Sequence, residues 1–169
     1  NRIAPKLSNE LDNLEVNVDT DNRRRWMRAL ADADTSELAD LWLRREPAPH
    51  AEWLRGPEAG LVMVRGRIGG RGDRFNVGEA TVTRATVRLF GAPLAGDVVG
   101  TSYVLGSDLD HARYGALFDA LLQDPGQHDQ VFAEVIEPLE TAQRERDAVT
   151  RAEARATVVD FFTVAREHE

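Results

Sequence analysis

The chain has 169 residues, of which 42% are hydrophobic, and a formal net charge of −8, which fits one domain built around a single core. It contains no cysteine, which excludes disulfides, iron–sulfur clusters, thiolate zinc sites and thiol nucleophiles. No apolar run approaches the roughly 20 residues of a membrane span and no signal peptide precedes the first helical pattern, so a cytoplasmic protein without membrane contact is expected.

The charge is unevenly distributed along the chain. Residues 65–88 hold six arginines and two acidic residues, whereas residues 107–169 hold six arginines and fourteen acidic residues. Such a chain lacks the broad basic footprint that nucleic-acid backbones require, so nucleic-acid binding is not expected. A local anion site or a salt-bridged interface stays open.

The first part of the chain indicates a helical hairpin. Residues 1–22 show no clear period and are expected to form an acidic, flexible extension before a single domain at residues 23–169. A first helix is indicated by apolar residues at three- and four-residue spacing: Trp26, Met27, Leu30 and Ala33. A second helix can be capped at Asp34 and must end before Pro47.

The middle of the chain predicts an antiparallel meander of three or four strands. The expected strands are Gly60–Ile68, Glu79–Phe90 and Val98–Leu105, joined by the glycine-rich GGRGDRFNVG and the turn GAPLAGD. In the second strand Val82 lies on one face and the apolar residues from Ala85 onward lie on the other. A bulge near Thr83 or Arg84 would reconcile the two patterns, and we predict one there.

Helical patterns return after the strands. Ser107 or Asp108 can cap a helix whose apolar stripe runs over residues 109–121. A longer pattern covers residues 131–159, and Pro138 should kink or divide it. The expected fold is therefore α+β, with the N-terminal helical hairpin and the C-terminal helices packed on one face of the sheet.

No catalytic constellation is evident in the sequence. The glycines of residues 66–78 precede a strand rather than a helix, and no Walker lysine follows them, so a hairpin loop is favoured over a phosphate loop. The four histidines lack metal-ligand spacing, so no metal site is expected. His111, in the first turn of a helix, is a candidate substrate contact; a capping or surface role is the alternative.

Two features stand out as candidate contact surfaces. One is the set of polar residues on the predicted sheet: Arg65, Arg67, Arg74, Asn76, Arg84 and Arg88. Arginine binds phosphate and carboxylate equally well, so substrate and partner protein both stay open. The other is VVDFF, residues 158–162, where Val158, Phe161 and Phe162 surround much of a helix and predict a partner interface, with packing within the chain as the alternative.

The chain resembles the PhnG family, the G subunits of the bacterial carbon–phosphorus lyase system. The resemblance covers about residues 23–166 and rests on these segments: RRRWM at 23–27, GLVMVRGRIGGRGDRFNVGEATVTRATVRL at 60–89, GTSYVLGSDLDHA at 100–112, ALFDALLQ at 116–123 and VDFFTVAR at 159–166. Residues 1–22 lie outside it.

The resemblance implies an accessory subunit used in phosphonate catabolism during phosphate starvation. In that system a phosphonate displaces adenine from ATP to give ribose 1-phosphonate 5-triphosphate. The implied partners are chiefly the I subunit and also the H, J and L subunits; ATP is the substrate of the assembled complex, and no cofactor of this chain's own is implied. The resemblance carries no catalytic residue onto this sequence.

Two other functions stay open at this stage. The arginine-bearing sheet could make the chain a phosphonate- or nucleotide-binding module, or the chain could be a purely structural scaffold. A homodimer of the isolated chain also stays open.

Overall fold

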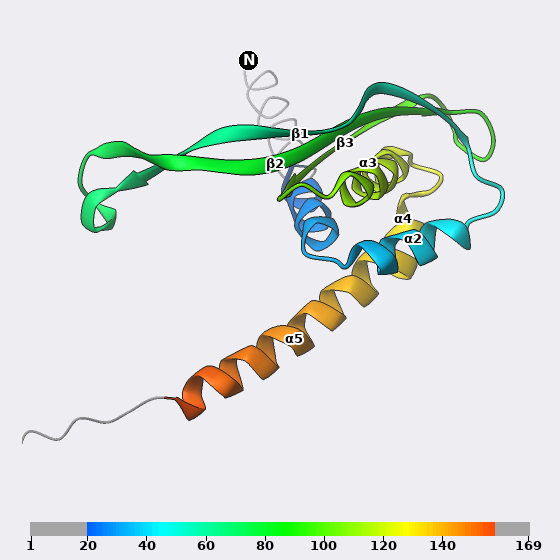
Figure 1. Cartoon of the computed structure of the whole chain (residues 1–169). Helices are drawn as coiled ribbons and strands as arrows, with labels where there is room; N and C mark the ends of the chain where they lie inside the picture. Colours follow the sequence, from blue (N-terminus) through cyan, green and yellow to red (C-terminus); the bar gives the residue numbers. More distant parts are fainter. Residues whose placement is uncertain (1–19, 158–169) are drawn as a thin grey trace, which may run out of the picture.

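A three-stranded antiparallel sheet organises the part of the chain that the computed structural model describes, residues 20–157 (Figure 1). Its strands are β1 (His50–Arg67), β2 (Arg74–Phe90) and β3 (Val98–Leu105), in the order β1-β2-β3. The predicted meander is confirmed, and β3 has the predicted bounds. β1 begins earlier than predicted because it is an edge strand, which tolerates the Gly56-Pro57 pair that would interrupt a central strand. β2 begins earlier because residues 74–78, predicted as part of the connection, pair with β1.

The bulge predicted near Thr83 or Arg84 is wrong. The β2–β3 ladder is regular from Val82, opposite Leu105, to Leu89, opposite Val98. Thr83 takes a buried position on the helix-facing side of β2, and its hydroxyl donates a hydrogen bond of 2.7 Å to the carbonyl oxygen of Gly106. A satisfied polar residue therefore continues the buried face of β2, and Val82 lies on the outer face. The register shifts of this region lie in β1, between Trp53 and Arg55 and between Arg55 and Glu58.

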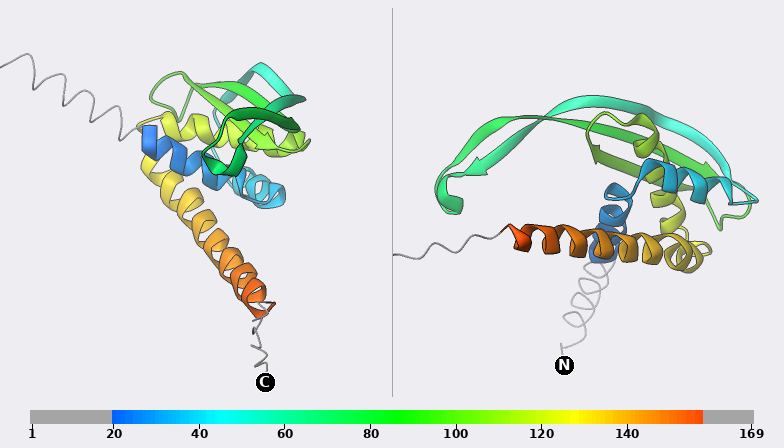
Figure 2. Two further views of the ribbon diagram at one scale, coloured as in Figure 1. Left: turned by 90° about the vertical axis from the view of Figure 1, so that its left-hand side faces the viewer. Right: turned by 60° about the horizontal axis from the view of Figure 1, so that its bottom comes forward.

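The helix α3 (Leu109–Gln123) covers the inner face of the sheet (Figure 1). Its N-cap is Asp108, whose carboxylate accepts from the amide of His111 at 2.9 Å and from the hydroxyl of Thr35 at 2.7 Å. These bonds, that from His111 first, hold the pKa of Asp108 below its ordinary value. Both sides of α3 are buried: one side faces the sheet, and other helices of the chain pack on the side of α3 that faces away from the sheet (Figure 2).

The N-terminal helices form that second layer, and the two helices predicted for this part of the chain are confirmed. Helical backbone covers residues 20–31, and α2 spans Thr35–Leu43. Trp26, Leu30 and Leu38 are buried against α3. The predicted extension over residues 1–22 lies mostly outside the described residues, but residues 20–22 are helical, so the expected boundary falls within a helix.

The C-terminal helical pattern is divided near Pro138, as predicted. A short helix α4 (His128–Val131) leads into a π-helical turn (Phe132–Ile136), and α5 (Glu137–Ala156) begins with Pro138 in its first turn. Proline is accommodated there because the first amides of a helix have no intrahelical acceptor. Beyond Arg146 the described part of α5 is mostly exposed, and it projects on the same side of the molecule as the long β1–β2 ribbon (Figures 1 and 2).

A fully buried carboxylate, that of Asp119 in α3, joins three elements. It accepts hydrogen bonds from Arg23 at 2.8 Å and from the indole nitrogen of Trp26 at 2.9 Å, both on the first helix. It also accepts from the backbone amide of Thr101 in β3 at 2.8 Å and from Gln123 at 3.1 Å. A buried charge is tolerated only with partners of this kind.

Substitution of Asp119 tests this junction. Asp119→Asn should lower the free energy of unfolding by about 2–4 kcal/mol, because the amide leaves Arg23 uncompensated and turns a donor toward other donors. Chemical denaturation of the purified chain measures the change. The control is Asp110→Asn in the same helix, where an exposed pair with Arg113 at 3.8 Å should contribute no more than about 1 kcal/mol. Equal, small losses in both variants would contradict the role given to Asp119.

The contact between α3 and β3 makes a second prediction. A Cβ atom at Gly100 would lie 2.1 Å from the carbonyl oxygen of Ala116, so the helix backbone rests directly on the strand. Gly100→Ala should therefore lower the free energy of unfolding by about 1–3 kcal/mol or more. At Gly96 a Cβ meets nothing within 4 Å, and Gly96→Ala should change it by less than about 0.5 kcal/mol. Thermal unfolding of both variants checks the difference.

Candidate functional site: the projecting arm

The β1–β2 ribbon continues well beyond the rest of the sheet. β3 ends with Leu105 opposite Val82, so residues 61–81 form a two-stranded projection that no other strand or helix of the described residues 20–157 covers; we call it the arm (Figure 1). From residue 61 to residue 79 every residue is exposed except Gly66, which is half-buried. Because an isolated two-stranded ribbon is marginally stable in water, the arm has the character of an element completed by a partner.

Apolar side chains are exposed on both faces of the arm. Leu61 is 65% exposed and Phe75 is 46% exposed, in a set that also contains Val62, Met63, Val64, Ile68 and Val77. Contiguous exposed apolar surface of this kind is typical of protein–protein contacts. Sequence reasoning could have found this surface from the run LVMV, whose consecutive apolar residues place side chains on both faces of a strand. The strand that carries the run is also much longer than the eight-residue β3.

A bulge in the arm sets the position of its polar residues. Val64 pairs with Gly78, but the next pair is Arg65 with Asn76, so Val77 is an extra residue in β2. The following pairs bring Arg67 opposite Arg74. Since side chains alternate along a strand, Arg65, Arg67, Arg74 and Asn76 share the inner face of the arm, which continues the helix-covered face of the sheet. We call these four residues the tip cluster.

The arginines predicted as one surface divide into two groups. Arg84 pairs with Glu58 at 2.8 Å, and Arg88 pairs with Glu52 at 3.2 Å and also with Asp97. The hydrogen bond from Arg88 to Asp97 is the main reason why the pKa of Arg88 is raised above its ordinary value. These two residues lie on the outer face beside β3 and are neutralised within the chain.

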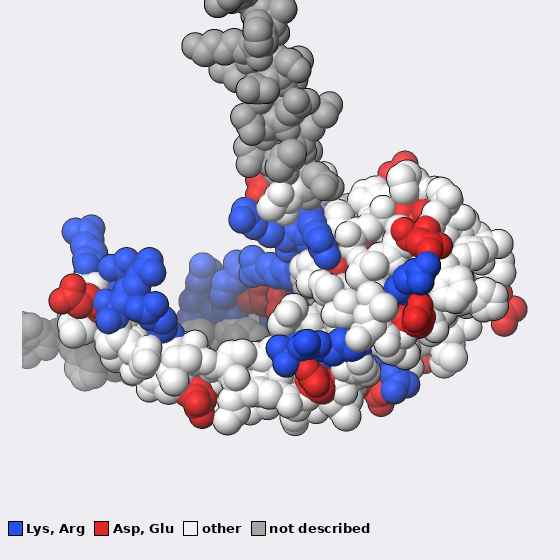
Figure 3. Space-filling model, turned by 90° about the horizontal axis from the view of Figure 1, so that it is seen from above, with Lys and Arg blue, Asp and Glu red and all other residues white. Residues whose placement is uncertain are grey.

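The tip cluster is not neutralised in this way. Among the described residues, no carboxylate lies within 4.0 Å of the guanidinium groups of Arg65, Arg67 or Arg74; the contact that Arg67 makes is a hydrogen bond of 3.1 Å to the carbonyl oxygen of Gly72. Figure 3 shows basic side chains gathered at the free end of the arm. The arm therefore ends in a concentrated positive charge on a chain whose net charge is negative.

His111 lies apart from the arm, in the interior. Its side chain is buried, and Nε2 donates a hydrogen bond of 2.8 Å to the carbonyl oxygen of Leu30, which ties α3 to the first helix. The structure thus gives His111 a packing contact rather than a position beside the other candidates. Val158, Phe161 and Phe162 lie outside the described residues, so the interface predicted for them stays a prediction.

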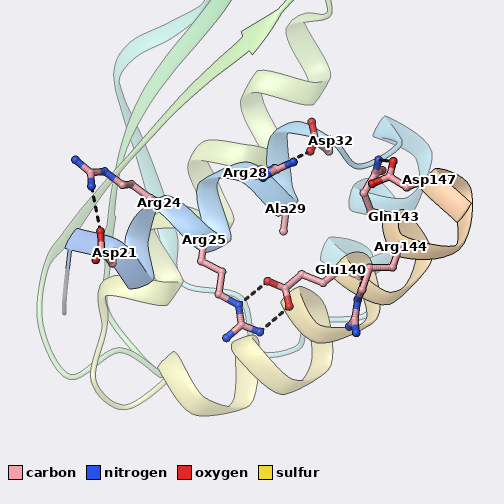
Figure 4. A pocket seen from close by; sticks show the side chains of 10 residues that line it. All are labelled: Asp21, Arg24, Arg25, Arg28, Ala29, Asp32, Glu140, Gln143, Arg144 and Asp147. Atoms are coloured by element: carbon pink, nitrogen blue, oxygen red, sulfur yellow. Dashed lines mark hydrogen bonds and ion pairs between the residues drawn. The ribbon is translucent and has the colours of Figure 1, made fainter. Parts of the chain in front are cut away.

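A groove between the first helix and α5 offers another concave surface, of about 760 Å³ (Figure 4). Most of its charges are paired across and along the helices: Arg25 holds Glu140 with two hydrogen bonds of 2.5 and 2.6 Å, and Arg24 pairs with Asp21 at 3.0 Å. The bond from Arg25 is the main reason why the pKa of Glu140 lies below its ordinary value. This balanced lining favours a helix–helix contact over a charged ligand.

Residues 20–157 contain neither a metal-binding cluster nor a membrane-spanning helix. In that range no three histidine or acidic side chains are placed to hold a metal ion. None of the helices described there is both long enough and apolar enough to cross a membrane.

Comparison with known proteins identifies the family to which the chain belongs. Residues 21–167 match the family described as phosphonate metabolism protein PhnG. A relative from Rhizobium meliloti (strain 1021), the alpha-D-ribose 1-methylphosphonate 5-triphosphate synthase subunit PhnG, is 46% identical over 144 residues, covering 85% of this chain and 88% of the relative. These similarities show that the chain belongs to the PhnG family.

Proposed function

We propose that this chain is an accessory subunit of a ribose 1-phosphonate 5-triphosphate synthase. In the proposed reaction a phosphonate oxygen bonds to the ribose carbon of ATP as the bond to adenine breaks, and adenine leaves with a proton. The name of the Rhizobium meliloti relative, a subunit of a synthase that makes ribose 1-methylphosphonate 5-triphosphate, supports this assignment. The setting would be phosphonate catabolism in the cytoplasm under phosphate starvation.

The observation that carries the proposal is the arm. It exposes apolar residues on both of its faces, and a ribbon of two strands gains little stability from its own hydrogen bonds in water. Contact with another subunit would bury both faces at once. We infer that this subunit is chiefly the I subunit of the carbon–phosphorus lyase system, within an assembly that also includes the H, J and L subunits.

The chain's own contribution to chemistry is then to complete a site on its partner. ATP would be the substrate of the assembly, and this chain would hold no cofactor of its own. The arm is suited to such a role because it reaches beyond the helical layer while its base is held in the sheet by β3. An active site shared between subunits would explain why a synthase requires a subunit built largely around an extended ribbon.

Charge placed on the outer face of the arm tests this role. Val64→Asp combined with Phe75→Asp should reduce co-purification with the I subunit at least about thirtyfold, because two apolar contacts become buried carboxylates. Adenine release from ATP and methylphosphonate by the reconstituted H, I and L subunits should fall in parallel. The isolated variant should keep its melting temperature, because both side chains are already exposed.

The matched control is Leu43→Asp, which charges an apolar residue that is 73% exposed at the end of α2, an element that lies away from the arm (Figure 1). It should leave both association and adenine release unchanged. If the double variant still associates and releases adenine like the unaltered chain, the arm is not the docking element. If adenine release does not depend on adding this chain at all, the accessory role itself is wrong.

A further inference from the structure

Resting on the proposed function, we propose that the tip cluster is a polyphosphate-binding site that the arm delivers to a partner's active site, where it holds the 5-triphosphate group. Arg65, Arg67 and Arg74 would bind phosphate oxygens, and the side-chain amide of Asn76 would donate an additional hydrogen bond. The partner subunit would bind the carbon–phosphorus end of the substrate and the displaced base.

The first support is the register of the arm. Arg67 and Arg74 are directly opposed, and Arg65 is two residues along the same strand. Directly opposed residues place their Cβ atoms about 4.5–5.5 Å apart, and like charges in such pairs are destabilising. Three arginines therefore occupy adjacent positions on one face, and no carboxylate of the described residues lies within 4.0 Å of their guanidinium groups. An external anion would remove that repulsion.

The second support is the bulge at Val77. Without the extra residue, the ladder would continue from the pair of Val64 and Gly78 by placing Asn76 opposite Gly66, on the outer face. The bulge instead turns Asn76 and Arg74 to the inner face, beside Arg65 and Arg67. Bulges that redirect side chains are typical of functional sites, and this one gathers every member of the cluster on one side.

The third support is the chemistry of the ligand. The product named for the Rhizobium meliloti relative carries a triphosphate, a linear group with several adjacent anionic oxygens. Planar guanidinium forks bind such oxygens with paired hydrogen bonds, and arginine stays charged at any physiological pH. The hydrogen bond from Arg67 to the carbonyl oxygen of Gly72 holds one of the three forks over the turn at the end of the arm.

The position of the cluster fits delivery into a partner. Leu61 and Met63 lie on the same inner face, nearer the body, and are exposed. On this face the arm thus presents Leu61 and Met63 first, with Glu79 opposite Met63, and the cationic groups at its end. That order suits an element that passes along a partner's surface and ends in a polar pocket.

The test uses the assembled complex with inorganic tripolyphosphate as the probe. The triple variant Arg65→Gln, Arg67→Gln and Arg74→Gln should raise the Kd for tripolyphosphate, measured by calorimetry, at least about thirtyfold, since three charge-assisted contacts are lost. The matched control is Arg55→Gln, Arg84→Gln and Arg88→Gln, which removes the same charge from arginines already paired with carboxylates. It should change Kd less than threefold. Gel filtration should show both complexes intact.

Two results would overturn the site. One is an intact complex of the triple variant whose Kd is unchanged. The other is loss of the complex in the triple variant but not in the control, which would mean that the cluster binds carboxylates of a partner protein. Both leave the accessory role standing. By contrast, failure of the unaltered chain to associate with synthase subunits would overturn the proposed function itself.

Discussion

The carboxylate of Asp119 is the interaction on which the body of this protein depends. It lies in the central helix, is fully buried, and accepts hydrogen bonds from the first helix, from β3 and from its own helix. The same contact fixes β3 against α3, and β3 in turn fixes the base of the β1–β2 ribbon. The strand that Asp119 holds against α3 is thus the strand at which the base of the arm is anchored.

The arm and the body differ in the exposure of their apolar side chains and in the pairing of their arginines. In the body, the apolar side chains on the helix-facing side of β2 are buried and Arg84 and Arg88 have carboxylate partners. In the arm, apolar side chains on both faces are exposed, and the arginines of the tip cluster lack such partners among the described residues. Both departures occur in the part of the ribbon that β3 cannot reach. A single extended element thus combines a protein-binding surface with a concentrated positive charge.

The sequence predicts the features of this fold that depend on local patterns. The meander, the bounds of β3, the cap at Asp108 and the division near Pro138 follow from periodicity, capping and proline chemistry. The arm and the bulge could not be placed, because register depends on which strand faces which. Arg84 and Arg88 have the same residue type as the tip cluster, yet only pairing across strands shows that they are neutralised. His111 likewise contacts a helix distant in sequence.

Hydrogen–deuterium exchange of the arm amides, residues 61–81, tests the central claim most directly. The chain is measured alone and in complex with the other synthase subunits. In the free chain these amides should exchange much faster than those of residues 82–89, and association should slow them at least about tenfold. An arm that exchanges as slowly as the body when free, and does not change on association, would contradict its assignment as the partner-completed element of this subunit.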